Sequence, residues 1–199
     1  MRKVTFMKLV WPSLEYLPGY VDALERGWSS DNLRPEEAIR EALDAIAEDP
    51  AAFVASKIDL EGRGSPITLP DGSAVPRLPG YNRWMWDGEF CGTIGLRWQP
   101  GTEALPPYCL GHIGYAVVPW KRQRGYATQA LREVLRDAAA EGLRYVELTT
   151  EPDNLVSQRV IETNGGVFVE EFTAPPGLGS KRGLRYRIAL EPARSAPRA

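Results

Sequence analysis

Residues 111–130, GHIGYAVVPWKRQRGYATQA, join the end of a strand pattern to a basic loop and the start of a helix. Pro119 ends the strand pattern, because proline has no N–H to donate to a strand ladder. Beyond Gly125 the apolar residues recur at helical spacing, at Ala127, Leu131, Val134, Leu135 and Ala138. This order aims several backbone N–H groups and the positive end of a helix at one point.

The loop therefore predicts an anion-binding site. Lys121, Arg122 and Arg124 add positive charge beside the helix start, and Gly125 permits a close backbone approach. A diphosphate would accept hydrogen bonds from the backbone amides and from these charged side chains. The alternative is an ordinary strand-to-helix turn with a solvated basic face, because short glycine motifs also arise by chance.

Composition limits the remaining possibilities. A chain of 199 residues suffices for one substantial core, and 43% hydrophobic with 25% charged residues is usual for a soluble domain. A net charge of −2 argues against a nucleic-acid surface. There is no apolar run of membrane-spanning length and no signal-type start, so we expect a cytoplasmic protein without membrane contact.

Cysteine and histidine are scarce. Cys91 and Cys109 could pair, but two cysteines in a chain of this size do not form a disulfide framework. Reduced thiols are the simpler expectation. With one histidine and two cysteines, we expect no structural metal site.

The element order predicts a layered α/β (α+β) fold, with helices flanking a mixed sheet. We expect a single domain over residues 1–190 and a flexible tail over 191–199. Strands are expected at 4–10, 81–86, 90–98, 111–118, 145–150, 167–172 and 184–190, and helices at 14–24, from Pro35, up to 141 and at 154–163. The glycine- and proline-rich stretch 58–79 is expected to be mainly loop.

A second segment, residues 151–166 (EPDNLVSQRVIETNGG), predicts a short capped helix. Asp153 or Asn154 suits the N-cap, and Gly165 with Gly166 suits the end. This local interpretation accounts for every residue without any binding role.

Together the two segments resemble the GNAT acetyltransferases. Residues 122–127, RQRGYA, resemble the family's pyrophosphate loop, Gln/Arg-x-x-Gly-x-Gly/Ala, and Asn154, Ser157 and Gly165 fall at the spacing of a second family motif. The resemblance extends best over residues 81–173. It implies a central mixed, mostly antiparallel twisted sheet in which two parallel strands splay apart, ending near Val118 and Thr150, with acetyl-CoA in the resulting V.

The resemblance also implies binding residues. The pantetheine arm would follow the backbone of Ala116, Val117 and Val118, as an added strand does. Asn154 and Ser157 would lie at the thioester end. The pyrophosphate would contact the amides of Arg122, Gln123, Arg124, Gly125, Tyr126, Ala127 and Thr128.

One position departs from the family pattern. Ile161 stands where many members have a tyrosine that protonates the leaving thiolate, and isoleucine has no proton to donate. Tyr115 or solvent would have to serve instead. A thiolate is a tolerable leaving group because thiols have a pKa near ~8.5.

His112 is the candidate general base, because it is the only histidine and precedes the loop by one strand length. The alternative is a histidine packed in the sheet. Glu89 and Glu147 are weaker candidates for the same role. No metal is required.

The sequence thus predicts an acetyl-CoA-dependent N-acetyltransferase acting on a primary amine of a small molecule or protein. The alternative is a non-catalytic acyl-CoA-binding or regulatory domain, which Ile161 favours. The expected partners are acetyl-CoA and an amine acceptor, with no nucleic acid and a possible homodimer.

Overall fold

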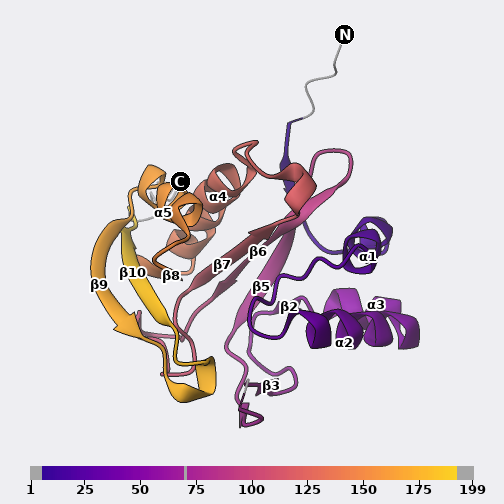
Figure 1. Ribbon diagram of the computed structural model, residues 1–199, viewed down its shortest axis with the longest axis horizontal. Coiled ribbons are helices and arrows are strands. Elements are labelled where there is room, and N and C mark those ends of the chain that lie inside the picture. Colours follow the sequence, from indigo (N-terminus) through magenta and orange to yellow (C-terminus); the bar gives the residue numbers. More distant parts are fainter. Residues whose placement is uncertain (1–5, 70, 192–199) are drawn as a thin grey trace, which may run out of the picture.

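The computed structural model describes residues 6–69 and 71–191, and Figure 1 shows its arrangement. The helices are α1 (Leu17–Glu25), α2 (Pro35–Glu48), α3 (Pro50–Ala55), α4 (Tyr126–Ala140) and α5 (Leu155–Thr163). The strands are β1 (Lys8–Val10), β2 (Ile58–Asp59), β3 (Ile67–Thr68), β4 (Ala74–Val75), β5 (Gly80–Trp86), β6 (Phe90–Arg97), β7 (Ile113–Val117), β8 (Tyr145–Thr150), β9 (Val167–Thr173) and β10 (Arg182–Ala189).

Two sheets form the centre of the molecule. The first has the order β1-β5-β6-β7, with β2 also paired to β5, and the second has the order β8-β10-β9. Every strand pairing within them is antiparallel. Helices α1 to α3 lie on one face of the first sheet, and α4 lies on the other, beside α5 and the second sheet (Figure 1).

Strands β7 and β8 are adjacent but do not form a ladder. The backbone link between them is a hydrogen bond from His112 N to Glu147 O, at 2.8 Å, just before β7 begins. Further along, β7 has β6 as its paired neighbour and β8 has β10. The predicted splayed strand pair is thus present, and the splay is wide enough to divide the sheet in two.

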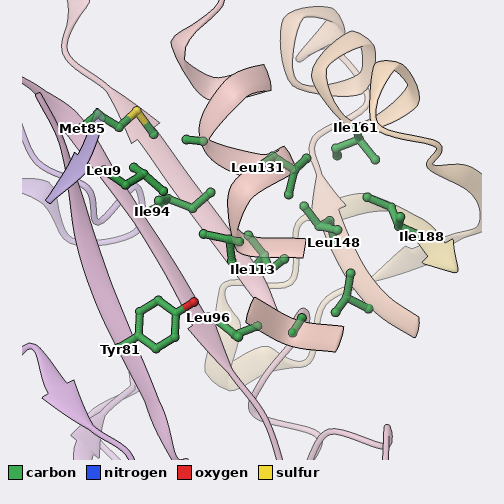
Figure 2. Packing of buried hydrophobic residues seen from close by; sticks show 14 of the residues in the cluster. Leu9, Tyr81, Met85, Ile94, Leu96, Ile113, Leu131, Leu148, Ile161 and Ile188 are labelled. Atoms are coloured by element: carbon green, nitrogen blue, oxygen red, sulfur yellow. The ribbon is translucent and has the colours of Figure 1, made fainter. Parts of the chain in front are cut away.

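Two hydrophobic cores hold the layers together. The larger core includes side chains from the first sheet, α4, α5 and the second sheet, so it spans both sheets (Figure 2). Leu131 of α4 lies between Ile94 of β6 and Leu148 of β8. The smaller core packs α1 and α3 against Trp84, Phe90 and Val118. Helix α4 therefore connects the two sheets where their backbones separate.

The predicted elements are largely confirmed, with three differences. Strand β1 is shorter than expected, and positions 4 and 5 lie outside the described residues, as do 192–199 of the expected tail. The stretch 58–79 is not only loop, because β2 pairs with β5 and β3 pairs with β4. Helix α3 was missed, although Asp49 caps it by accepting a hydrogen bond from Ala52 N.

Ile161 lies in the larger core, with 1% of its surface exposed. A Cβ atom on Gly166 would clash with the Cγ2 atom of Ile161, so the turn that ends α5 packs directly over Ile161. The residue at the position of the family's tyrosine is therefore a packing residue in this chain.

We predict that Ile161→Ala lowers the free energy of unfolding by about 2–5 kcal/mol, the usual loss for a large buried aliphatic side chain. Val156→Ala, on the same helix but 72% exposed, is the matched control and should change it by less than about 1 kcal/mol. Denaturant unfolding of both variants measures the difference. Equal effects would show that Ile161 is not a core residue.

Candidate functional site

The loop before α4 has the backbone of an anion nest. Gln123 has a φ of 61° and Gly125 a φ of 77°, so left-handed residues alternate with an ordinary one. Such alternation turns successive N–H groups toward one concavity. Because Gln123 has a Cβ atom, a positive φ strains its backbone. Strained backbone of this kind is concentrated at functional sites.

Successive N–H groups of this nest are free. Among the described residues, the backbone amides from Gln123 to Thr128 have no hydrogen-bond partner, and the first bond at the helix start runs from Gln129 N to Gly125 O at 3.0 Å. The amide of Arg122, also predicted to bind, is instead directed to Pro119 O at 3.4 Å. The stretch 122–125 is exposed, so an anion can reach the free amides.

A buried carboxylate anchors the nest, and the sequence analysis missed it. Asp87, in the hairpin turn between β5 and β6, has a side chain only 6% exposed. It accepts hydrogen bonds from Lys121 Nζ at 2.9 Å and from Tyr126 Oη at 2.6 Å, and Arg124 lies 3.8 Å away.

The cationic side chains beside the loop are therefore partly paired with carboxylates of the same chain. Lys121, which was expected to attract phosphate, is buried and also pairs with Glu89 at 2.7 Å. Burial opposes ionisation of Asp87, but the hydrogen bonds from Tyr126 and Lys121 prevail and hold the pKa of Asp87 below its usual value. The positive charge of Lys121 thus fixes the loop in place, and the free backbone amides supply the binding groups.

The edge of β7 that faces β8 is the second part of the site. Val118 N donates to Cys91 O at 3.0 Å, so Val118 directs its backbone to β6, and the two-residue repeat gives Ala116 the same direction. Tyr115 and Val117 then present their backbone groups to the opening between the sheets. Accordingly, Arg122 Nε reaches Val117 O there, at 3.3 Å. Ala116, Val117 and Val118 were predicted to pair with an extended ligand through their backbones. Of these three, Val117 presents its backbone groups to the opening, and Tyr115 does so as well.

Tyr115 crosses the opening with its side chain. Its hydroxyl lies 2.8 Å from Ser157 Oγ on α5, which brings two predicted site residues together. Burial raises the pKa of Tyr115 to about 12, so the phenol keeps its proton at neutral pH. Asn154 is the N-cap of α5, because its Oδ1 accepts from Ser157 N at 3.1 Å. Of the two predicted caps, Asp153 and Asn154, the structure has Asn154, and its side-chain NH₂ group has no acceptor among the described residues.

His112 lies at the closed end of the opening. The ring is fully buried, and Nδ1 accepts a hydrogen bond from Glu147 N at 3.0 Å. Because Nδ1 accepts, the proton of the neutral ring is on Nε2, which has no partner among the described residues. Neither nitrogen then has a free lone pair, which a general base needs. Instead, the imidazole accepts a hydrogen bond from β8 that a backbone carbonyl would normally accept, at the point where β7 and β8 separate.

The two weaker candidates for the base are also engaged. Glu147 accepts from Arg185 Nη1 at 3.1 Å and from Arg187 Nη2 at 2.7 Å. Glu89 pairs with Lys121. The site thus combines an anion nest, a free strand edge and a protonated phenol, and the described side chains leave no evident base in it.

This combination suits a ligand with a diphosphate, an extended polar chain and a reactive end near Tyr115. The nest would bind the diphosphate, and the edge of β7 would pair with amide groups of the chain as with an added strand. The phenol would then lie where a proton can be given to a leaving group.

Comparison with known proteins agrees with this geometry. Residues 69–167 match a family model described as an acetyltransferase (GNAT) domain. No curated protein is similar enough in sequence to count as a match.

Several solved structures share the fold. The microcin C7 self-immunity acetyltransferase MccE, in complex with acetyl-CoA and AMP, is 12% identical, with a TM-score of 0.62 over 92% of each chain. RimL, a ribosomal L7/L12 α-N-protein acetyltransferase in complex with coenzyme A, is 15% identical, with a TM-score of 0.62 over 94% of this chain and 96% of its own. The enzyme from Salmonella typhimurium that modifies the N-terminal serine of L7/L12 is 15% identical, with a TM-score of 0.60 over 95% of this chain and 97% of its own.

Other features of the described part of the chain complete the site's setting. It contains no group of three or more histidine, cysteine or acidic side chains placed to hold a metal ion. Cys91 and Cys109 are free thiols. No helix within the described residues is both long and apolar enough to cross a membrane.

The buried imidazole predicts a pH-dependent stability. Burial lowers the pKa of His112 from 6.5, with the Glu147 carboxylate acting in the opposite direction. The folded protein therefore binds this proton less readily than the unfolded chain. The neutral ring contributes its full stability above ~6.5, and this contribution is lost as the pH falls toward the lower folded pKa.

We predict that the wild-type free energy of unfolding declines as the pH falls below about 6.5, with a slope of up to about 1.4 kcal/mol per pH unit. His112→Gln, whose amide oxygen can accept from Glu147 N, should be less stable at neutral pH but lack this slope. Urea unfolding at several pH values measures both. Parallel curves for the two proteins would show that His112 does not titrate with folding.

Proposed function

Since the chain belongs to the GNAT acetyltransferases through residues 69–167, we propose that it is an acetyl-CoA-dependent N-acetyltransferase acting on a primary amine of a small molecule or protein. The observation that carries this proposal is the nest of unpaired amides from Gln123 to Thr128 beside the opening between β7 and β8. The acetyl-CoA and coenzyme A complexes of MccE and RimL support the same ligand.

Each part of the ligand has a proposed counterpart. The amides of residues 123–128 hold the pyrophosphate, with Arg122 and Arg124 beside it, and the backbone of Tyr115 and Val117 pairs with the pantetheine arm. Asn154 offers its NH₂ group at the far end of the opening, next to Ser157. Acetyl-CoA supplies the acetyl group as an activated thioester.

Tyr115 is the proposed proton donor to the departing thiolate. Its raised pKa keeps the phenol protonated, and Ser157 holds the hydroxyl in place. His112 is proposed as a positioning residue, because its ring lacks a free lone pair. The proton of the amine then leaves to solvent, which suits an amine that arrives partly neutral.

The alternative function is acyl-CoA binding without catalysis. The buried Ile161 in place of the family's tyrosine favours it. Tyr115 favours the enzyme, because its hydroxyl reaches Ser157, one helical turn before Ile161. Binding of coenzyme A without acetylation of any amine in a broad panel would establish the alternative. A cytoplasmic location, a single domain over residues 1–190 and a homodimer stay predictions.

We predict that Gly125→Asp abolishes binding of coenzyme A, because it places a carboxylate beside the amides that would hold the pyrophosphate. The matched control is Gly142→Asp, at the other end of α4. Gly142 has a φ of 87° against 77° at Gly125, and a Cβ at either position meets no atom within 4 Å. Both variants thus carry the same backbone strain.

Calorimetric titration with coenzyme A, together with the shift in melting temperature that binding produces, tests this pair. Gly142→Asp should bind as the wild type does. The loop assignment is wrong if Gly125→Asp binds normally or if both variants lose binding alike.

We predict that Tyr115→Phe reduces turnover about tenfold with coenzyme A affinity unchanged, since a thiolate needs less help than an alkoxide. The loss should be largest above neutral pH, where solvent protons are scarce. Ser157→Ala keeps the phenol and should reduce turnover less. Thiol release across pH measures all three proteins, and an unchanged rate in Tyr115→Phe would assign the proton to solvent.

A further inference from the structure

The face of the first sheet opposite α4 is only partly covered. Helices α1 and α3 lie on this face (Figure 1). Their side chains share the smaller core with Trp84, Phe90 and Val118. Beyond them, on the same face, Gly114 of β7 and Asn82 of β5 are exposed and Gly95 of β6 is partly exposed. Because β6 is an inner strand, the partial exposure of Gly95 marks a part of this face that the helices of the described residues leave open.

These residues form a row across the sheet. Asn82 pairs with Gly95, and Gly95 pairs with Gly114. The row ends at Gly114, next to Tyr115, whose backbone faces the opening between the sheets. The row therefore leads from the outer part of the sheet to the place where the thioester is proposed to lie.

The other face offers no such path. Tyr115 and Val117 turn their side chains toward α4 and α5, where they pack against the larger core. Ile113 of the same strand is buried there. An amine can therefore approach the edge of β7 most directly across the exposed row.

A guanidinium lies over the inner end of this row. Arg97 of β6 directs one terminal nitrogen to 3.0 Å from the position that a Cβ on Gly114 would occupy. The Asn82 side chain lies over Gly95 in the same manner, with Oδ1 at 2.5 Å from the corresponding Cβ position. Glycine at these two positions thus makes room for two polar side chains on the sheet surface.

A second cation lies at the outer end. Lys57 O accepts from Asn82 N at 2.7 Å, which continues the row, and Lys57 Nζ lies 3.8 Å from the centre of the Phe53 ring. Burial, and then the nearby Arg77, lowers the pKa of Lys57 to about 8. The row therefore has a cation near each end.

Neither cation is neutralised within the described chain. No carboxylate of the described residues lies within 4 Å of Arg97 or Lys57, and residues 1–5, 70 and 192–199 include no aspartate or glutamate. The largely buried cations Lys121 and Arg185 are paired with Asp87 and Glu147, whereas Arg97 is exposed and has no such partner among the described residues. Arg97 is exposed, so its guanidinium is open to a ligand beside the proposed reaction site, and a guanidinium without an acidic partner among the described residues can recognise a carboxylate or phosphate by paired hydrogen bonds.

We propose that the acceptor is an amine that carries an anionic group, bound by Arg97 on the row Asn82–Gly95–Gly114 with Lys57 at its outer end. This inference rests on the proposed N-acetyltransferase function and names the substrate class of that site. The anionic group comes either from a small amino acid-like molecule or from an acidic residue next to the N-terminus of a peptide.

The transfer balances without a further reactant. The amine nitrogen forms a bond to the acetyl carbon, the thioester C–S bond breaks, the nitrogen loses one proton and the thiolate gains one. Arg97 and Lys57 assist before the transfer, because nearby positive charge disfavours the ammonium form of the acceptor.

The experiment compares each acid with its uncharged amide. One arm uses β-alanine and β-alaninamide, and the other uses the peptides Ser-Glu-Ala-amide and Ser-Gln-Ala-amide. Acetylated product is measured with acetyl-CoA, and binding of the same probes is measured by calorimetry on protein saturated with coenzyme A. Arg97→Gln is the test variant. Arg136→Gln, on the exposed side of α4, is the matched control.

We expect the acid of at least one arm to have a KM about tenfold or more below that of its amide. Arg97→Gln should remove that preference by raising KM for the acid, with coenzyme A affinity unchanged, and Arg136→Gln should keep it. The arm that responds identifies the source of the anion.

Three results would overturn the inference: acids and amides that react or bind alike, a preference that survives Arg97→Gln, and a preference for the amides. Each can occur with normal coenzyme A binding and thiol release. Failure of the proposed function looks different, because coenzyme A then does not bind, or it binds and no amine is acetylated. In the second case, calorimetry still decides whether Arg97 binds the acids.

Discussion

The separation of β7 from β8 is the constraint on which the rest of the structure depends. Two neighbouring strands normally satisfy each other's amides along their whole length. Here one backbone bond joins them, from His112 N to Glu147 O, and the amide of the same Glu147 donates to the His112 ring in place of a carbonyl. An imidazole is wider than a peptide carbonyl, so the strands diverge from this point, and α4 closes the larger core across the gap.

The separation leaves polar groups unsatisfied, and other interactions offset that cost. Within residues 6–69 and 71–191, the edge of β7 and the amides from Gln123 to Thr128 lack the partners that an ordinary sheet and helix start would supply. Gln123 is also held at a positive φ. Asp87 stabilises this strained loop by accepting hydrogen bonds from Lys121 and Tyr126. The loop amides thus stay free for the proposed ligand, while the buried pair of Asp87 and Lys121 stabilises the loop. Such compensation is common where function opposes stability.

The sequence predicted what local chemistry determines. Pro119, Gly125 and the helical apolar spacing identified the strand, loop and helix, and Asn154 was identified as a cap. It could not predict the roles of His112 and Asp87, because both depend on partners 35 and 39 residues away in the chain. The sequence of β7 predicted that its side chains alternate between two faces, but it could not predict the register of β7 with β6. Only that register shows that Tyr115, and not Ala116, presents its backbone to the opening.

The two-residue repeat of β7 would let this strand contact both proposed substrates. Odd-numbered positions turn their backbone toward the gap and their side chains toward α4 and α5, so Tyr115 can pair with an extended ligand and still place its hydroxyl on Ser157. Even-numbered positions turn their side chains to the opposite face, where Gly114 has none. A larger residue at 114 would displace the Arg97 guanidinium and cover the end of the exposed row. The smallest residue of β7 therefore lies where, under the proposed function, an amine would approach the thioester from the face opposite coenzyme A.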